Sequence, residues 1–216
     1  MPDADPIRTV VLISGGGSTL DNLAQRIADQ RLRGVRIVGV ICSRAGVGGI
    51  EVARRHGLPI ELIPRAGFPD DDTFSDAVTA AVRRMGAELA LMGGFLSFWR
   101  IPADFDGRVL NIHPALLPAF GGRGMYAARV HRAVLAAGAS HSGCTVHVAD
   151  NEYDHGPILA QRRVPVLPGD TPERLAQRIG EQERELYPLV VQAIADQGRS
   201  SLPIQAAALQ RVLAQS

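Results

Sequence analysis

The sequence predicts an α/β fold, a Rossmann-like, doubly wound and mostly parallel sheet with a C-terminal extension. Through residue 113, short continuous apolar runs alternate with segments of helical periodicity. Continuous apolar runs are typical of strands that are buried on both faces, as parallel strands are. A Gly-rich turn follows each of the first two runs, as expected at strand–helix junctions. After residue 120 this alternation stops, which indicates a second structural part.

Five apolar runs are expected to form the parallel strands, at residues 7–14, 35–42, 59–63, 88–92 and 108–113. Between them, apolar residues at helical spacing predict helices at residues 18–31, 50–56 and 72–85. Ser18 is the expected N-cap of the first helix, and Gly34 and Gly86 follow helices that they are expected to end.

The second part begins with a predicted helix, and its further elements follow in the order helix 126–137, strands 142–149 and 158–166, helix 172–196 and helix 202–213. Pro172 suits the first turn of the long helix, with Asp170 or Thr171 as its cap. A length of 216 residues fits one domain. We therefore expect a single domain at residues 1–200, with halves at 7–113 and 114–200, and a tail helix within 201–216.

Composition excludes several classes of function. The formal charge of +1, without a basic run, gives no reason to expect a nucleic acid or a membrane as partner. The chain contains no lysine, which excludes a Walker-type phosphate lysine, a Schiff base and a lysine general base. The acidic clusters at residues 70–72 and 181–185 are interpreted as solvated helix faces.

The two cysteines indicate a reducing compartment. Cys42 and Cys144 each lie inside an apolar strand run and form no Cys-x-x-Cys pair. The first six residues are polar and turn-like, which does not match a signal peptide. We therefore expect a cytoplasmic protein that acts on small molecules, as a monomer or a homodimer.

The most informative segment is Asn111-Ile112-His113-Pro114 at the end of the fifth strand. Residues i and i+2 of a strand share a face, so the amide and the imidazole point the same way, and the proline forces the chain to leave the sheet. An Asn can stabilise an oxyanion and a His can move a proton. Asp154, in a later turn, offers a carboxylate that would raise the pKa of a neighbouring His113. Asn, His and Asp together suit an acyl-type transfer.

A glycine-rich loop, Gly15-Gly16-Gly17-Ser18, joins the first strand to the first helix. Backbone N–H groups at such a helix start suit a phosphomonoester. The loop does not match a dinucleotide fingerprint, because Leu20 occupies the third glycine position and the second strand ends without a ribose-binding acid.

Several segments match one family in order and cover nearly all of residues 7–198: Val11 to Ser18, Gly94-Phe95-Leu96, Leu110 to Pro114, Thr145-Val146-His147, Asp154 to Pro157, Glu183 and Tyr187 to Val190. Together they resemble the glycinamide ribonucleotide transformylases, a family of folate-dependent formyltransferases. The resemblance implies formyl transfer from 10-formyltetrahydrofolate to the amine of glycinamide ribonucleotide in purine biosynthesis, without a metal. It also implies that the half at 7–113 binds phosphate and the half at 114–200 carries folate and catalysis.

The resemblance assigns site residues by position. The catalytic residues would be Asn111, His113 and Asp154. Gly16, Gly17, Ser18 and Thr19 would hold the phosphate, and Glu183 the ribose hydroxyls. The folate would lie against Phe95, Leu96, Val109, Asn151, Glu152 and Tyr153.

The chain departs from the family pattern at positions associated with the acidic folate tail. Ser97 and the aspartates at 70–72 stand where basic residues are usual, which leaves Arg65 or Arg100 as possible substitutes. His155 replaces a common glycine. The loop at residues 120–126 is longer than usual and is a candidate lid.

The remaining histidines divide by their predicted surroundings. His147 points from a strand toward the region of His113 and is expected to support the site by contacting a catalytic residue. His131 is placed on a polar helix face, with no role. A zinc site of His113, His147 and Asp154 is disfavoured, because the spacing lacks a compact ligand pair.

Three alternatives stay open. A formyltetrahydrofolate hydrolase resembles this family in using the same Asn, His and Asp but usually has an additional regulatory domain. A methionyl-tRNA formyltransferase would need an RNA-binding domain and a basic face. A non-catalytic Rossmann-like nucleotide-binding protein would keep the glycine loop but would not need the Asn, His and Asp together.

Overall fold

The computed structural model describes residues 5–214 and contains one seven-stranded sheet with the strand order β3-β2-β1-β4-β5-β6-β7. The strands are β1 (Ile7–Ile13), β2 (Val35–Cys42), β3 (Ile60–Leu62), β4 (Leu89–Met92), β5 (Val109–His113), β6 (His141–Val148) and β7 (Ile158–Pro165). β1 to β5 are parallel, whereas β6 and β7 are antiparallel to their neighbours. The expected mostly parallel sheet with an extension after β5 is confirmed. The expected boundaries at residues 1 and 216 lie outside the described residues.

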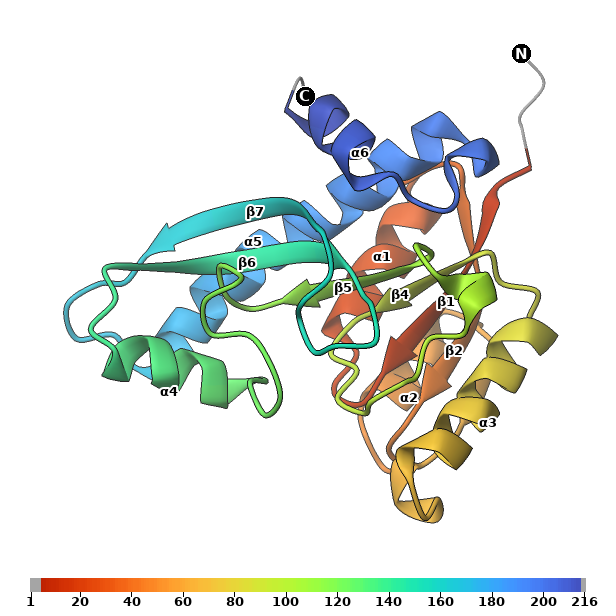
Figure 1. Cartoon of the computed structure of the whole chain (residues 1–216), viewed down its shortest axis with the longest axis horizontal. Helices are drawn as coiled ribbons and strands as arrows, with labels where there is room; N and C mark the ends of the chain where they lie inside the picture. Colours follow the sequence, from red (N-terminus) through yellow and green to blue (C-terminus); the bar gives the residue numbers. More distant parts are fainter. Residues whose placement is uncertain (1–4, 215–216) are drawn as a thin grey trace.

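Helices lie on both faces of the sheet (Figure 1). They are α1 (Ser18–Ala28), α2 (Gly49–Arg55), α3 (Asp71–Arg84), α4 (Ala128–Ala136), α5 (Pro172–Gln197) and α6 (Ala206–Leu213). Alternate residues of β1 enter two separate cores, because successive strand side chains point to opposite faces. Val11 packs with residues of α1, α2 and α5, whereas Val10 packs with residues of α3 and with Trp99.

Three expected helix boundaries are wrong. Ser18 is not the N-cap of α1; Gly17 is, and its left-handed φ of 79° suits a glycine. The same helix ends before Gln30, whose φ is 61°. α6 begins at Ala206 instead of residue 202, because Leu202 precedes Pro203 and its backbone is extended (φ −94°, ψ 133°), the conformation that a following proline favours.

The antiparallel pairing of β5 with β6 positions the expected catalytic residues. It sets Asn111 opposite His147 and His113 opposite Thr145. The turn between β6 and β7 then returns the chain, with Asp154, to the end of β5. A substituent at Gly156 would lie 1.9 Å from the carbonyl oxygen of Val148, so only glycine fits behind this turn.

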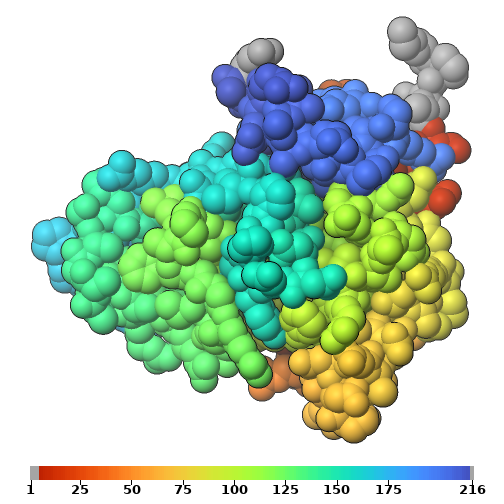
Figure 2. All heavy atoms as spheres, viewed as in Figure 1, coloured from red at the N-terminus to blue at the C-terminus, as the bar shows by residue number. Residues whose placement is uncertain are grey.

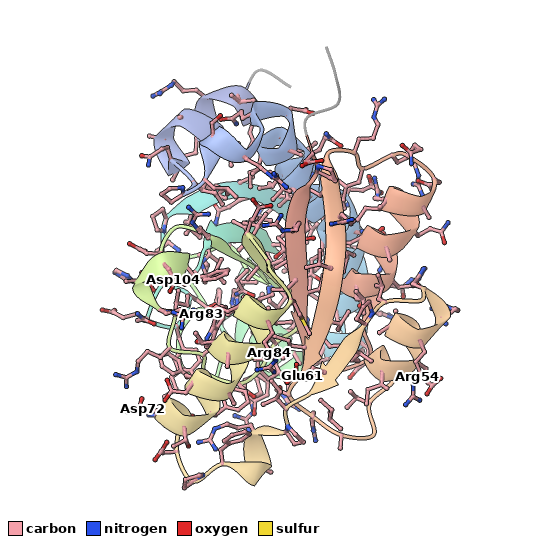
Figure 3. All side chains as sticks on the ribbon, turned by 90° about the vertical axis from the view of Figure 1, so that its right-hand side faces the viewer. Arg54, Glu61, Asp72, Arg83, Arg84 and Asp104 are labelled. Atoms are coloured by element: carbon pink, nitrogen blue, oxygen red, sulfur yellow. The ribbon has the colours of Figure 1, made fainter. Side chains whose placement is uncertain are left out.

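Ion pairs cover the outer face of α3 (Figure 3). Arg83 contacts Asp104 at 2.8 Å and Arg84 contacts Glu61 at 2.6 Å; Glu61 is half-buried, and the other three residues are exposed. Such exposed pairs add little stability, about 0–1 kcal/mol each. Among residues 5–214, none of the helices combines the length and the apolar character that crossing a membrane requires.

Candidate active site

A cavity of about 620 Å³ opens at the carboxyl ends of the parallel strands. It lies where the strand order reverses between β1 and β4, the position at which open α/β sheets bind ligands. The turn around residue 150, teal in Figure 2, packs between the green segment leading to α4 and the yellow-green segment after β4. All three expected catalytic residues line the cavity, Asn111, His113 and Asp154.

Asn111 is held by His147, which is buried. Nδ1 of His147 lies 3.1 Å from the carbonyl oxygen of Val148, and because a carbonyl only accepts, Nδ1 carries the hydrogen. Nε2 is therefore free to accept a hydrogen bond from the Asn111 amide nitrogen, at 3.0 Å. The same amide nitrogen donates to Oδ1 of Asp154 at 3.4 Å. His147 thus fixes which end of the Asn111 amide faces the carboxylate.

His113 lies between the Asp154 carboxylate and the loop at residues 120–126. Its Nε2 donates to the carbonyl oxygen of Phe120 at 2.9 Å, and its Nδ1 faces Oδ2 of Asp154 at 3.4 Å. Since Nε2 carries one hydrogen, a second proton on this ring would sit at Nδ1, next to the carboxylate. His113 and Asp154 are therefore arranged to share a proton.

The charges of this pair differ from the sequence expectation. Burial lowers the pKa of His113, and although the Asp154 charge and the Phe120 carbonyl raise it, the net shift is downward. Asp154 contributes in the expected direction, but desolvation of the imidazolium has the larger effect and determines the net shift. Burial alone would raise the pKa of Asp154, but the net shift is downward, with a contribution from the hydrogen bond that the Gly122 N–H donates to Oδ2. At neutral pH the pair is a neutral imidazole beside a carboxylate.

The loop at 120–126 also fixes the carboxylate of Asp154. The backbone N–H of Gly122 donates to Oδ2 at 3.0 Å. A substituent at Gly121 would lie 3.1 Å from Cβ of Asp154 and 2.5 Å from Leu117. The loop can therefore pack this closely against Asp154 only because residue 121 is a glycine. Gly122, Gly124, Met125 and Tyr126 line the cavity, as expected of a lid.

The glycine loop forms the second wall of the cavity. Residues Gly15 to Thr19 line it, at the N-terminus of α1. A substituent at Gly17 would meet Cα of Gly49 at 2.7 Å, which explains why this position is glycine. With no side chain capping α1, its first N–H groups are available to an anion.

Glu183 of α5 borders the cavity next to Ser18 and Thr19. Burial raises the pKa of its carboxyl group to about 7, and the charge of Arg184 only partly opposes this. The expectation of a solvated acidic helix face is therefore wrong for Glu183, whose carboxyl group points to the cavity and not to bulk water.

This raised pKa predicts a pH-dependent stability. Below about 4.5 both folded and unfolded states hold the proton; between 4.5 and about 7 only the folded state keeps it, so the free energy of unfolding falls as pH rises. Glu183→Gln removes this effect. The free energy of unfolding of Glu183→Gln, relative to that of the parent, should increase from pH 4.5 to about 7 and stay constant above pH 7. Denaturant titrations at pH values below and above 7 measure it. A pH-independent difference would contradict the raised pKa.

The wall of the cavity that faces the turn around residue 150 is aromatic and apolar. Residues 95–99 line it together with Glu152 and Tyr153, and the rings of Phe98 and Tyr153 lie 5.2 Å apart. Two expected folate contacts lie elsewhere. Val109 is fully buried in the core beneath the cavity. The Asn151 side chain instead bonds to both backbone groups of Ile101, which anchors the turn.

The two arginines that were possible partners for an acidic folate tail are already paired. Arg65 contacts Asp71 at 2.9 Å and Arg100 contacts Asp72 at 2.6 Å. Asp70 instead caps α3 through the N–H of Thr73. The aspartates thus neutralise both guanidinium groups.

His131 is the residue that sequence reasoning misplaced. It is only 5% exposed and lines the cavity, so the expected polar surface position is wrong. The apolar face of α4 is evident in the sequence from Val130 and Val134. His131 lies beside that face and is buried with it, through tertiary contacts that the periodicity of the sequence does not reveal.

Comparisons with known proteins identify relatives over most of the chain. A family model described as formyl transferase matches residues 7–191. A chloroplastic phosphoribosylglycinamide formyltransferase of Arabidopsis thaliana is 40% identical over 195 residues, which are 88% of this chain and 66% of the relative. The chain thus spans about two thirds of that protein, and 61% of the corresponding Vigna unguiculata protein.

A bacterial relative is covered more fully. The phosphoribosylglycinamide formyltransferase of Mycobacterium tuberculosis is 39% identical over 202 residues, which are 92% of this chain and 89% of the relative. Among solved structures, glycinamide ribonucleotide transformylase 1 from Symbiobacterium toebii superimposes with a TM-score of 0.83 at 36% identity, over 90% of both chains.

Proposed function

Because the chain belongs to the formyl transferase family, we propose that it transfers a formyl group from 10-formyltetrahydrofolate to the amine of glycinamide ribonucleotide, a step of purine biosynthesis. The observation that carries the proposal is the cluster of Asn111, His113 and Asp154 between two unlike walls of one cavity. The glycine loop suits the phosphate of the acceptor, and the aromatic wall suits the pterin ring of the donor.

The residues have separate roles in the reaction. The acceptor amine attacks the formyl carbon and forms a tetrahedral intermediate whose negative charge is on the formyl oxygen. The Asn111 amide donates to that oxygen and does not titrate. Asp154 accepts, through a water molecule, the proton that the attacking nitrogen loses. Collapse of the intermediate breaks the bond to N10 of the folate, which takes up a proton as it leaves.

The pair of His113 and Asp154 adapts its charge to the reaction. A proton at Nδ1 of His113 would face Asp154 at 3.4 Å and turn the neutral ring into an imidazolium beside the developing oxyanion. The lid holds both groups through Phe120 and Gly122. We include a cytoplasmic location in this proposal, because both cysteines are free and buried. A monomer or a homodimer would suffice, since every proposed residue comes from one chain.

One assay tests the function and separates it from the alternatives. Formyl transfer is measured from 10-formyltetrahydrofolate to glycinamide ribonucleotide, with a control lacking the acceptor. Product formation that depends on the acceptor supports the proposal. Folate deformylation at the same rate without acceptor would indicate a hydrolase. Binding of the ribonucleotide with no turnover would indicate a nucleotide-binding protein.

The glycine loop leads to a prediction about the phosphate. Backbone N–H groups at the start of α1 should provide most of the recognition, because no side chain caps this helix and the chain has no lysine to bind the phosphate in their place. Glycinamide riboside without its phosphate should therefore bind much more weakly than the ribonucleotide in calorimetric titrations. High salt should reduce that difference, because screening weakens the attraction of an exposed anion. Equal affinity for the two ligands would show that the loop is only a tight turn.

A further inference from the structure

His131 is a buried histidine without a partner. Among residues 5–214, two buried side-chain atoms have no hydrogen-bond partner, Nδ1 of His131 and Oγ of Ser142. Of these two residues only His131 lines the cavity. A buried polar atom without a partner costs folding free energy, and an apolar side chain of similar size would avoid this cost. A polar group left unpaired at a binding cavity suggests that a ligand supplies the partner.

The position of His131 indicates which ligand. α4 packs against α5 (Figure 1), and α5 contributes Gln177 and Glu183 to the cavity. His113 is close enough for its charge to lower the pKa of His131. His131 therefore shares the cavity with His113, on a helix that packs against α5, the helix that carries Glu183. The aromatic wall comes from other segments, those after β4 and β6.

We propose that His131 binds the amide linkage of the glycinamide arm, the part of the acceptor that joins the ribose to the reacting amine. This rests on the proposed function. Burial lowers the pKa of His131, so the ring is neutral at pH 7. The unpaired Nδ1 of a neutral imidazole either donates or accepts, according to the tautomer, and an amide offers a partner for each case, its carbonyl or its N–H. His131 thereby positions the amine without taking part in proton transfer.

The experiment compares His131→Leu with the parent by calorimetric titration of two ligands, glycinamide ribonucleotide and ribose 5-phosphate, which lacks the arm. His131→Leu should weaken binding of the ribonucleotide by about threefold to tenfold, the range that one neutral hydrogen bond typically contributes. It should leave the affinity for ribose 5-phosphate unchanged. Because the unpaired nitrogen is removed, Tm should rise by about 2–4 °C.

Two further variants separate binding from helix packing. His131→Gln keeps a donor and an acceptor, and should recover part of the lost affinity. Val134→Ala, on the same helix but in the core, should lower Tm and leave both affinities unchanged. His131→Leu and Val134→Ala thus have opposite expected effects on Tm and on affinity, so a general disturbance of α4 would not produce the result expected for His131→Leu.

Two outcomes would overturn the proposal, and they are distinguishable. If the parent prefers the ribonucleotide to ribose 5-phosphate but His131→Leu keeps that preference and loses stability, His131 has a structural role only. If the parent binds both ligands equally, the acceptor assignment itself fails, and the role of His131 with it. A lowered preference together with a raised Tm supports the proposal.

Discussion

Asp154→Asn is expected to lower kcat by about 10²–10⁴, the range for loss of general acid–base catalysis. The change preserves the shape of the side chain and removes the charge that faces Nδ1 of His113 at 3.4 Å. The amide can no longer accept the proton of the attacking amine. Binding of both substrates should change far less, because Asp154 sits at the reacting end of the cavity, away from the glycine loop. Steady-state kcat and calorimetric Kd values for both proteins check this expectation.

The second half of this prediction concerns coupling between the two residues. In the double variant with His113→Ala, the loss in kcat should be much smaller than the product of the two single losses, since residues that act as one unit are not additive. Fully multiplicative losses would mean that the two groups act separately. Far-UV circular dichroism and Tm for each protein exclude unfolding, because His113 is buried and its truncation leaves a cavity.

Much of the sheet could be predicted, because its buried strands are continuous apolar runs that the local sequence shows directly. The expected strand at residues 35–42 matches β2 at both ends, since Gly34 precedes the apolar run. The turn at Gly17 and the turn that follows α1 at Gln30 depend on left-handed backbone conformations. At Gly17 this conformation accompanies a close approach to Cα of Gly49, a contact that the local sequence does not encode.

The candidate site divides in the same way. Asn111 and His113 could be found because strand geometry places residues i and i+2 on one face. Glu183 and His131 could not be understood from their own segments. Glu183 lies in a charged run, and His131 lies beside an apolar helix face. Both become buried only when the segments that line the cavity pack together. The lowered pKa of His113 has the same origin, since desolvation comes from the whole fold.

Asn111→Ala should lose about 2.7–4 kcal/mol of transition-state stabilisation, a decrease of about 10²–10³ in kcat. The amide nitrogen has two hydrogens. One is bound firmly by His147 at 3.0 Å, and the other reaches Asp154 only at 3.4 Å, which is a weak hydrogen bond. The weaker contact is the one that a developing oxyanion can replace, while His147 keeps the amide in place.

The size of this loss can be separated from structural damage. Asn111 is only half-buried and its partner His147 keeps its bond to Val148, so the fold and phosphate-ligand binding should survive the truncation. His147→Leu is the informative companion, since it leaves the Asn111 donor in place but removes the acceptor that orients it. It should lower kcat less than Asn111→Ala does, with little further loss when the two changes are combined. Single-turnover formyl transfer measures all three proteins. If Asn111→Ala retained more than a third of the parental kcat, the oxyanion would have to be stabilised by other donors, and Asn111 would have no such role.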